Sequence, residues 1–223
     1  MICSADYLLI RHLKPQAESG ICYGRLDLPA AEVPDSACAV LAADFFATNP
    51  QALLFSSPLQ RAAQLAQVMA GAVLTDPTFD AAWQEIDFGR WEGLKWSSIP
   101  KTDIDAWQQN LSGFDAHGGE SALQLQQRVL KAWQAWLQQR QGGILISHLG
   151  VIRMLMGQVL EMPLSSQLRL QLDYQHLIWL RRTWQCQCDK GGCSSHCKPL
   201  PQSEVWQVKG LNWPIEMAIP FFK

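Results

Sequence analysis

The chain has 223 residues, of which 48% are apolar and 17% charged, a balance typical of a globular protein. The formal net charge of −2 excludes a global basic field that would draw the protein to nucleic acid or to an anionic membrane. No stretch approaches the roughly 20 apolar residues of a membrane span, and the N-terminal residues lack the features of a signal peptide. We therefore expect a cytoplasmic protein without nucleic-acid or membrane partners, in which most of the seven cysteines are thiols or metal ligands.

The first predicted element is a buried strand over residues 8–10, which ends directly on Arg11 and His12. In open α/β sheets, ligand sites lie beyond the carboxyl ends of the strands, so these two side chains are candidate site residues. Residues 13–29 follow with two prolines, two glycines and no helical period. This pattern predicts a long loop at the same end of the strand, and long loops in compact domains are usually functional.

Alternating helices and short strands are predicted next. A helix is expected over residues 35–48, a strand over 52–55, an alanine-rich helix from Pro58 to about residue 70, and a third strand over 72–75. Arg61 falls in the first turn of the second helix, where its charge opposes the helix dipole. An arginine at this position suggests that it binds an anion together with the helix N-terminus; the alternative is an ordinary exposed arginine.

The middle of the chain contains a mixed loop and the clearest helix. Residues 85–93 combine carboxylates, glycines and aromatics, which is typical of a loop, and residues 96–110 favour short helical pieces. Ser121 and Gln124 form a capping box that opens a helix ending before residues 142–143. One face of this helix is predicted to be core, through Leu125, Val129, Trp133, Trp136 and Leu137.

A second strand with the same form as the first covers residues 144–147 and ends on His148. A helix over 151–160, a strand over 176–181 and a returning strand over 205–213 follow. The order of strands and helices predicts an α/β fold, a three-layer α/β/α sandwich with a mostly parallel central sheet. We expect one domain over residues 1–223.

Residues 184–204 are predicted to be a cysteine-rich insertion or hairpin between two edge strands. Thiolates favour tetrahedral zinc, so a small structural zinc site is one interpretation of the four cysteines. Their spacing is C-x-C-x4-C-x3-C and not the paired C-x2-C form, so a variable hairpin with adventitious thiols is the alternative. The four candidate ligands are Cys186, Cys188, Cys193 and Cys197.

Five residues together suggest a reaction. Arg11 and Arg61 carry forked N–H donors that match phosphate oxygens. His12 and His148 can act as nucleophile or proton carrier near neutral pH, and Glu85 can protonate a leaving oxygen. These groups suffice for phosphoryl transfer through a phosphohistidine, without a metal ion. Each residue alone has a structural alternative; the joint pattern carries the interpretation.

Several motifs with this chemistry occur in one order along the chain. They are Leu-Ile-Arg-His at 9–12, Ser-Ser-Pro-Leu-Gln-Arg-Ala at 56–62, Glu-Ile-Asp-Phe-Gly-Arg-Trp-Glu-Gly at 85–93, Gly-Gly-Glu-Ser at 118–121 and Ile-Ser-His-Leu-Gly-Val-Ile-Arg at 146–153. The chain resembles the histidine phosphatase superfamily, the phosphoglycerate-mutase-like proteins, from residue 7 to about residue 160. The resemblance implies a phosphoglycerate-mutase-like fold and catalysis on a small phosphorylated metabolite without a cofactor.

The resemblance also implies a role for each residue. His12 looks like the phosphorylated nucleophile, and Arg11 and Arg61 look like the phosphate clamp. His148 looks like the second histidine of the pocket, which binds the phosphoryl group and its transition-state charge. Glu85 looks like the proton donor to the leaving group and later the base for water.

Three residues depart from the family pattern. Leu13 replaces the usual glycine after the histidine, although its backbone carbonyl can still orient the His12 ring. Pro15 replaces a threonine, and Glu18 replaces an asparagine that often contacts phosphate. Because a carboxylate would repel a phosphate dianion, Glu18 is expected to point away or to be paired. These changes affect the expected loop geometry.

Within the superfamily, residues 21–29 and 85–93 look most like the α-ribazole phosphatase branch, which removes the 5′-phosphate of α-ribazole phosphate in cobalamin nucleotide-loop assembly. The resemblance places Tyr23 and Gly24 among the substrate-binding residues. Tyr23, Trp91 and Trp96 would suit an aromatic base by stacking, or they pack the loop.

Other functions are weighed beside this one. The nearest is a broad-specificity phosphatase or one for another small metabolite. A mutase must hold a second phosphate and exclude water, and the chain lacks a long inserted lid and extra basic residues. A non-catalytic module that binds a phosphorylated ligand is opposed by the presence of all five residues. The sequence leaves open which of Arg25, Arg90 and Arg153 joins the pocket.

Overall fold

The computed structural model describes residues 1–186, 200 and 203–222. The strands are β1 (Ile2–Arg11), β2 (Leu53–Ser56), β3 (Thr78–Phe79), β4 (Gly143–Ser147), β5 (His176–Gln185) and β6 (Val205–Pro214). The helices are α1 (Ser36–Thr48), α2 (Gln60–Val73), α3 (Lys101–Gln109), α4 (Ala122–Gln139), α5 (Leu149–Val159), α6 (Leu164–Gln167) and α7 (Ile215–Ala218). Short 3-10 turns are η1 (Ala81–Trp83), η2 (Gly89–Trp91), η3 (Trp96–Ser98) and η4 (Ile219–Phe221).

The strands form one mixed sheet in the order β3-β2-β4-β1-β5-β6. The first four of these strands are parallel to one another. Strand β5 pairs antiparallel with β1, and β6 pairs antiparallel with β5, so β6 again has the direction of β1. In the central pair, Arg11 of β1 lies opposite Ser147 of β4, so the two strands end at the same level. The α/β class is confirmed, and the shared strand ends are what bring His12 and His148 together.

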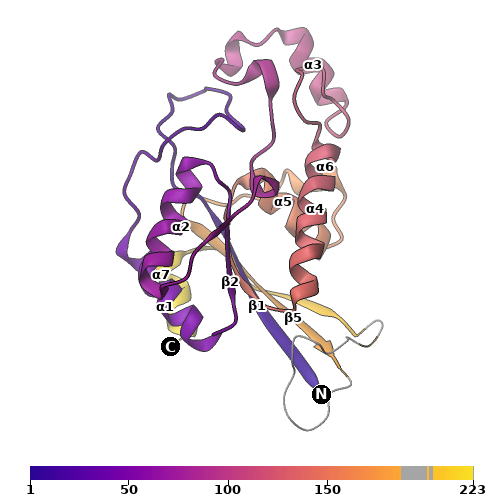
Figure 1. Cartoon of the computed structure of the whole chain (residues 1–223). Helices are drawn as coiled ribbons and strands as arrows, with labels where there is room; N and C mark the ends of the chain where they lie inside the picture. The colour runs from indigo at the N-terminus through magenta and orange to yellow at the C-terminus, as the bar shows by residue number, and fades with distance from the viewer. Residues whose placement is uncertain (187–199, 201–202, 223) are drawn as a thin grey trace.

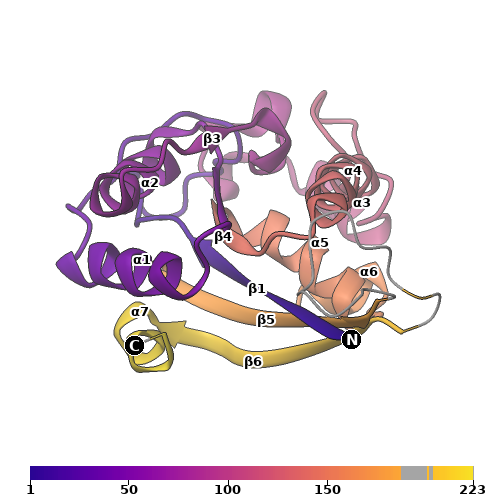
Figure 2. The ribbon, with the colours of Figure 1, turned by 60° about the horizontal axis from the view of Figure 1, so that its bottom comes forward.

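Helices cover both faces of the sheet, and β1 contributes alternate residues to the two cores. Tyr7 and Leu9 pack with α4 and α5 on one face, and Leu8 and Ile10 pack with α1, α2 and α7 on the other. Figure 2 shows α1, α2 and α7 on one side of the strands and α4, α5 and α6 on the other. Because the second half of β1 is buried on both faces, residues 7–10 form a continuous apolar run and not an alternating one.

Two helix starts follow the expected capping chemistry. The carboxylate of Asp35 accepts a hydrogen bond from the Ala37 amide at 2.8 Å and caps α1. At α4, the Ser121 hydroxyl accepts from the Gln124 amide, and the Gln124 side chain accepts from the Ser121 amide. The predicted capping box is therefore confirmed, and it starts the helix that packs its apolar face against the sheet.

The predicted strand over residues 72–75 is wrong. Helix α2 continues through Val73, and Leu74 ends it in a left-handed conformation with a φ of 52°. The strand comes later, at Thr78–Phe79, where it pairs with β2. A short apolar run does not distinguish the last turn of a helix from a strand by periodicity, and the favourable helix formers before it decide the outcome.

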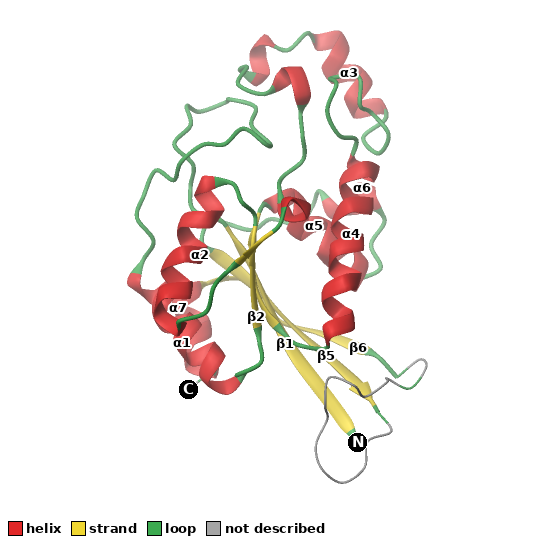
Figure 3. Ribbon diagram, viewed as in Figure 1, coloured by secondary structure: helices red, strands yellow, loops and turns green. Residues whose placement is uncertain are grey.

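A third, smaller apolar cluster lies beyond the sheet. Trp91, Cys22 and Ile99 are buried together, and Phe88, Trp96, Ile104, Trp107 and Phe114 pack around them. Figure 3 shows α3 and long loops at the end of the molecule away from the N-terminus, where this cluster lies. Trp91 is 1% exposed, so the packing interpretation of this tryptophan holds and stacking on a substrate does not.

The insertion predicted over residues 184–204 begins too early, because β5 continues through Gln185; β6 begins at Val205. Of the four candidate zinc ligands, Cys188, Cys193 and Cys197 lie outside the described residues. Cys186 is buried, with its Sγ atom 3.0 Å from Sγ of Cys3. The zinc site therefore stays a prediction. Within the described part of the chain, no helix combines the length and the hydropathy that a membrane crossing requires.

Candidate active site

His12 and His148 lie side by side at the carboxyl ends of β1 and β4. The His12 amide donates to the Ser147 carbonyl at 2.9 Å, which continues the ladder between the two strands. The two imidazole rings are 4.7 Å apart between centroids, and their residues are 3% and 0% exposed. The parallel register thus converts two distant strand ends into one pair of histidines, as the strand-end argument predicts.

The carbonyl of Leu13 orients the His12 ring. Its oxygen lies 2.5 Å from Nδ1 of His12, and because a carbonyl only accepts, Nδ1 must carry the proton in this contact. Nε2 is then left with the lone pair. Leu13 is not among the described residues with a positive φ, so its backbone does not require glycine. The replacement of glycine is therefore compatible with this orientation of the His12 ring.

Two arginines surround this pair of histidines. Arg61 of α2 is fully buried and donates to the carbonyls of Leu26 at 2.8 Å and Gly24 at 2.7 Å. Arg11 donates to the Leu172 carbonyl at 2.5 Å and lies 3.8 Å above the ring of Tyr174. A guanidinium has five N–H donors, so both arginines keep donors for an anion after these contacts.

Three buried nitrogens of this group have no hydrogen-bond partner among the described residues. They are Nε of Arg11, Nε of Arg61 and Nδ1 of His148. The other ring nitrogen of His148 is 2.7 Å from the Ser57 hydroxyl, so the ring itself is held in place. Buried polar groups are normally paired, and unpaired ones clustered at a strand end match the oxygens of an anion such as phosphate.

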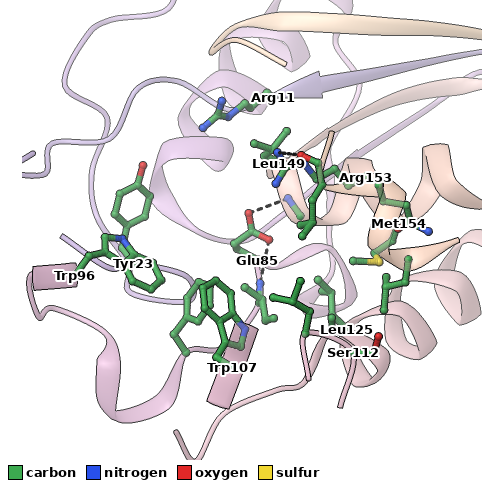
Figure 4. A pocket seen from close by; sticks show the side chains of 18 of the residues that line it. Arg11, Tyr23, Glu85, Trp96, Trp107, Ser112, Leu125, Leu149, Arg153 and Met154 are labelled. Carbon is green, nitrogen blue, oxygen red and sulfur yellow. Dashed lines mark hydrogen bonds between the residues drawn. The ribbon is translucent and has the colours of Figure 1, made fainter. Parts of the chain in front are cut away.

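Glu85 reaches the same place from the loop before η2. One carboxylate oxygen accepts from the Ile86 amide and the other from the Gly150 amide, both at 3.0 Å. A Cβ at residue 150 would overlap with Oε1 of Glu85, so a side chain there would displace the Glu85 carboxylate from this position. Figure 4 shows Glu85 between Arg153 and Trp107 in the pocket, with dashed lines for these hydrogen bonds.

The pocket has a volume of about 530 Å³. The charged and titratable part of its lining includes Arg11, His12, Arg61, Glu85 and Arg153. The rest is mainly apolar, and Trp96 and Trp107 form part of its wall as a stacked pair, 5.8 Å apart between centroids with an interplanar angle of 19°. This division suits a phosphomonoester with a sizeable leaving group.

The substrate-binding predictions for the neighbouring loop have different placements. Tyr23 lines the pocket, and its hydroxyl lies 2.8 Å from the hydroxyl of Tyr174. Gly24 does not line the pocket; its carbonyl accepts from Arg61, and a Cβ there would overlap with the Ile86 carbonyl. Glu18 is an exposed residue with its carboxylate 3.9 Å from Nζ of Lys95, as charge repulsion from the site predicts.

Two residues that the sequence does not reveal lie at the site: Trp107 in the pocket lining, and Tyr174 outside the lining but against Arg11 and His12. Trp107 and Tyr174 belong to no motif, and only the tertiary fold brings them near Trp96 and Arg11. Of the three arginines left open, Arg153 lines the pocket. Arg25 pairs instead with Glu120 and Asp87, and Arg90 pairs with Asp103. The sequence signal for Arg153 was its position, one turn into the helix that directly follows His148.

Burial keeps both histidines neutral. Burial and the positive charges of Arg61 and Arg11 lower the pKa of His12 well below its ordinary value, against the raising effect of the Leu13 carbonyl. Burial, the neighbouring His12 and the two arginines likewise lower the pKa of His148. A neutral His12 is the form that has a lone pair for nucleophilic attack, so the site is set for this chemistry at neutral pH.

These pKa shifts predict that stability falls in mild acid. Below about pH 6.5 these histidines bind protons in the unfolded chain but stay neutral in the folded protein. The free energy of unfolding therefore decreases as the pH falls. The expected slope is up to about 1.4 kcal/mol per pH unit for each imidazole. Urea unfolding at pH values between 7.5 and 5.0 measures this slope. Glu120, whose pKa is lowered, loses its contribution to stability only at more acidic pH and does not interfere. His12→Asn is expected to reduce the slope by the share of one imidazole, while His148 and His117, whose pKa values burial also lowers, keep the remainder. A urea midpoint that does not change across this pH range in the wild type would contradict the lowered pKa values.

Sequence comparison assigns the chain to a family. The model of the histidine phosphatase superfamily (branch 1) matches residues 7–187, and the chain belongs to this superfamily. It is 30% identical over 145 residues, 59% of this chain and 67% of the relative, to the probable phosphoglycerate mutase GpmB of Salmonella arizonae.

Solved structures agree on the fold. A mycobacterial glucosyl-3-phosphoglycerate phosphatase in complex with inorganic phosphate has a TM-score of 0.69 at 19% identity, covering 95% of this chain and 99% of that one. The alpha-ribazole phosphatase from Shigella flexneri has a TM-score of 0.68 at 19% identity, covering 93% and 96%. The phosphoglycerate-mutase-like fold expected from the sequence is thereby confirmed.

Proposed function

We propose that the protein is a phosphatase that hydrolyses a small phosphomonoester through a phosphohistidine at His12, without a metal ion. The observation that carries this proposal is the hydrogen bond from Nδ1 of His12 to the Leu13 carbonyl, which leaves Nε2 as the nucleophile. Arg11 and Arg61 supply the positive charge that phosphoryl transfer requires.

In the first step, Nε2 of His12 attacks phosphorus and the N–P bond forms as the bond to the leaving oxygen breaks. The protonated carboxyl of Glu85 gives its proton to that oxygen, which departs as an alcohol. The two guanidiniums and the unpartnered Nδ1 of His148 meet the charge on the phosphoryl oxygens.

In the second step, the Glu85 carboxylate takes a proton from water while the water oxygen attacks phosphorus. The N–P bond breaks, inorganic phosphate leaves, and both His12 and Glu85 return to their starting protonation states. One carboxyl group therefore acts first as acid and then as base. Its hydrogen bonds with the amides of Ile86 and Gly150 hold it in the same position for both steps.

We favour α-ribazole 5′-phosphate as the substrate, in cobalamin nucleotide-loop assembly. The stacked Trp96 and Trp107 and the ring of Tyr23 provide apolar faces that an aromatic base can contact. The structural similarity to an alpha-ribazole phosphatase agrees with this choice and, at 19% identity, does not select it over other phosphatases.

A phosphatase for another small metabolite is the second candidate. Arg153 adds a further cation to the pocket lining, which would suit a substrate with a carboxylate beside its phosphate. One structural neighbour is named for such a substrate, glucosyl-3-phosphoglycerate, and a sequence relative is named as a phosphoglycerate mutase. Arg153 also donates to the carbonyls of Leu170 and Leu168, so part of its donor capacity is used inside the protein.

A substrate panel in the presence of EDTA tests the proposal. It contains α-ribazole 5′-phosphate, 3-phosphoglycerate, phosphoserine and an aryl phosphate, with phosphate release as the measurement. We expect turnover that the chelator does not reduce, with kcat/KM highest for the ribazole phosphate. Preference for 3-phosphoglycerate would select the second candidate, and the appearance of 2-phosphoglycerate would indicate a mutase. Loss of all turnover in EDTA with recovery on adding a divalent metal would contradict the metal-independent mechanism, and inactivity without EDTA would favour a binding module.

A further inference from the structure

The loop that carries Glu85 is held by one arginine of helix α4. Nη1 of Arg128 donates to the carbonyls of Ala81, Ala82 and Gln84 at 3.2, 2.9 and 3.0 Å. Nη2 of Arg128 donates to the carbonyl of Glu85 itself at 3.3 Å. A single guanidinium thus contacts four carbonyls within five consecutive residues, the last of them belonging to the proposed proton donor.

Glu120 holds Arg128 in this orientation. Nε and Nη2 of Arg128 donate to the two carboxylate oxygens of Glu120, both at 2.8 Å, a bidentate pair. The Glu120 amide donates to the Asp87 carbonyl at 2.8 Å, and its carboxylate accepts from the Asp87 amide at 3.4 Å. Arg25 adds a contact to Glu120 at 2.9 Å. The pair therefore fixes residues 81–85 through Arg128 and Asp87 through Glu120.

This arrangement sets the position of the Glu85 carboxylate indirectly. The Glu85 side chain accepts from its own neighbour Ile86 and from Gly150 of α5, where there is space only because residue 150 has no Cβ. A small displacement of the loop would move the carboxylate away from Gly150 or against it. Misplacement of a catalytic group by about 1 Å can lower a rate about 100-fold. Arg128 does not line the pocket.

We propose that Arg128 is a positioning residue for Glu85: it binds the loop carbonyls and thereby places the carboxyl group at the leaving oxygen. The inference rests on the proposed role of Glu85 as proton donor. It predicts a defect that depends on the leaving group, because an alkoxide needs a proton at the transition state and a nitrophenolate does not.

The test compares kcat/KM for an alkyl phosphate and for p-nitrophenyl phosphate in Arg128→Gln and Arg128→Lys. We expect the loss on the alkyl phosphate to exceed the loss on the aryl phosphate by at least about tenfold in Arg128→Gln. Arg128→Lys keeps the charge and part of the donor capacity, so a smaller but equally selective loss is expected. Lys131→Gln, an exposed residue of the same helix, is the matched control and should change neither value.

The variant Glu85→Gln tests the role of Glu85 as proton donor separately from the positioning role of Arg128. If it loses alkyl phosphate turnover selectively and Glu85→Gln/Arg128→Gln shows no further selective loss, Arg128 acts through Glu85. If Glu85→Gln is selective but both Arg128 variants lose the two substrates equally, the positioning role is overturned and the proposed function stands. If Glu85→Gln itself shows no selectivity, the role of Glu85 is wrong and the inference falls with it. Thermal unfolding and inorganic phosphate binding establish that each variant is folded.

Discussion

Replacement of His12 by asparagine is expected to lower kcat/KM by at least about 10³-fold, because the variant has no nitrogen lone pair that can attack phosphorus. The wild-type protein should form a covalent phosphoenzyme when mixed with radiolabelled substrate and quenched in alkali, which preserves the N–P bond. His12→Asn should trap no label. Residual turnover at the wild-type rate, or label retained in the variant, would contradict the assignment of the nucleophile.

Retention of phosphate binding distinguishes a lost nucleophile from a damaged pocket. Arg11 and Arg61 are held by backbone carbonyls and not by His12, so the anion site should persist in His12→Asn. Inorganic phosphate should therefore raise the melting temperature of the variant as it does that of the wild type. Loss of both activity and this stabilisation would mean that the substitution disrupts the site as a whole.

Replacement of Arg61 by methionine is expected to lower kcat/KM by about 10²–10³-fold, because a charge that faces the phosphoryl oxygens is removed. A second effect is on stability. The buried Gly24 carbonyl loses its donor, which costs about 1–3 kcal/mol, so the urea midpoint should fall as well. Inorganic phosphate should no longer raise the melting temperature of this variant.

Arg90→Met is the control for this pair of effects. The Arg90 side chain is 56% exposed, pairs with Asp103 and lies outside the pocket lining. A surface pair of this kind contributes about 0–1 kcal/mol, so activity and midpoint should be nearly unchanged. Equal activity losses in the two variants would show that general surface charge, and not the placement of Arg61, supports catalysis.

Much of the site follows from local sequence patterns. A strand that ends on Arg11 and His12, and another that ends on His148, identify the two histidines, because parallel strands present their carboxyl ends at one edge of a sheet. Asp35 and Ser121 likewise mark helix starts by chemistry that acts over two or three residues. Such signals depend only on neighbours along the chain, and the structure agrees with them.

Other features depend on contacts between distant segments and have no local pattern. Trp107 joins Trp96 in the pocket wall, Tyr174 packs on Arg11, and Arg128 reaches the Glu85 loop only after α4 docks on the sheet. The strand expected over residues 72–75 shows the same limit, since a short apolar run ends a helix or forms a strand according to its surroundings.

The sequence by itself determined the α/β class and the pair of strand-end histidines, and it supplied the residues that we propose for phosphoryl transfer. Only the tertiary structure decided that Trp91 is core, that the Gly24 carbonyl binds Arg61, and that Arg153 lines the pocket. The physical reason is the range of the interactions. Capping and strand periodicity act between neighbouring residues, whereas burial and side-chain contacts across the pocket arise only when the sheet and its helices have assembled.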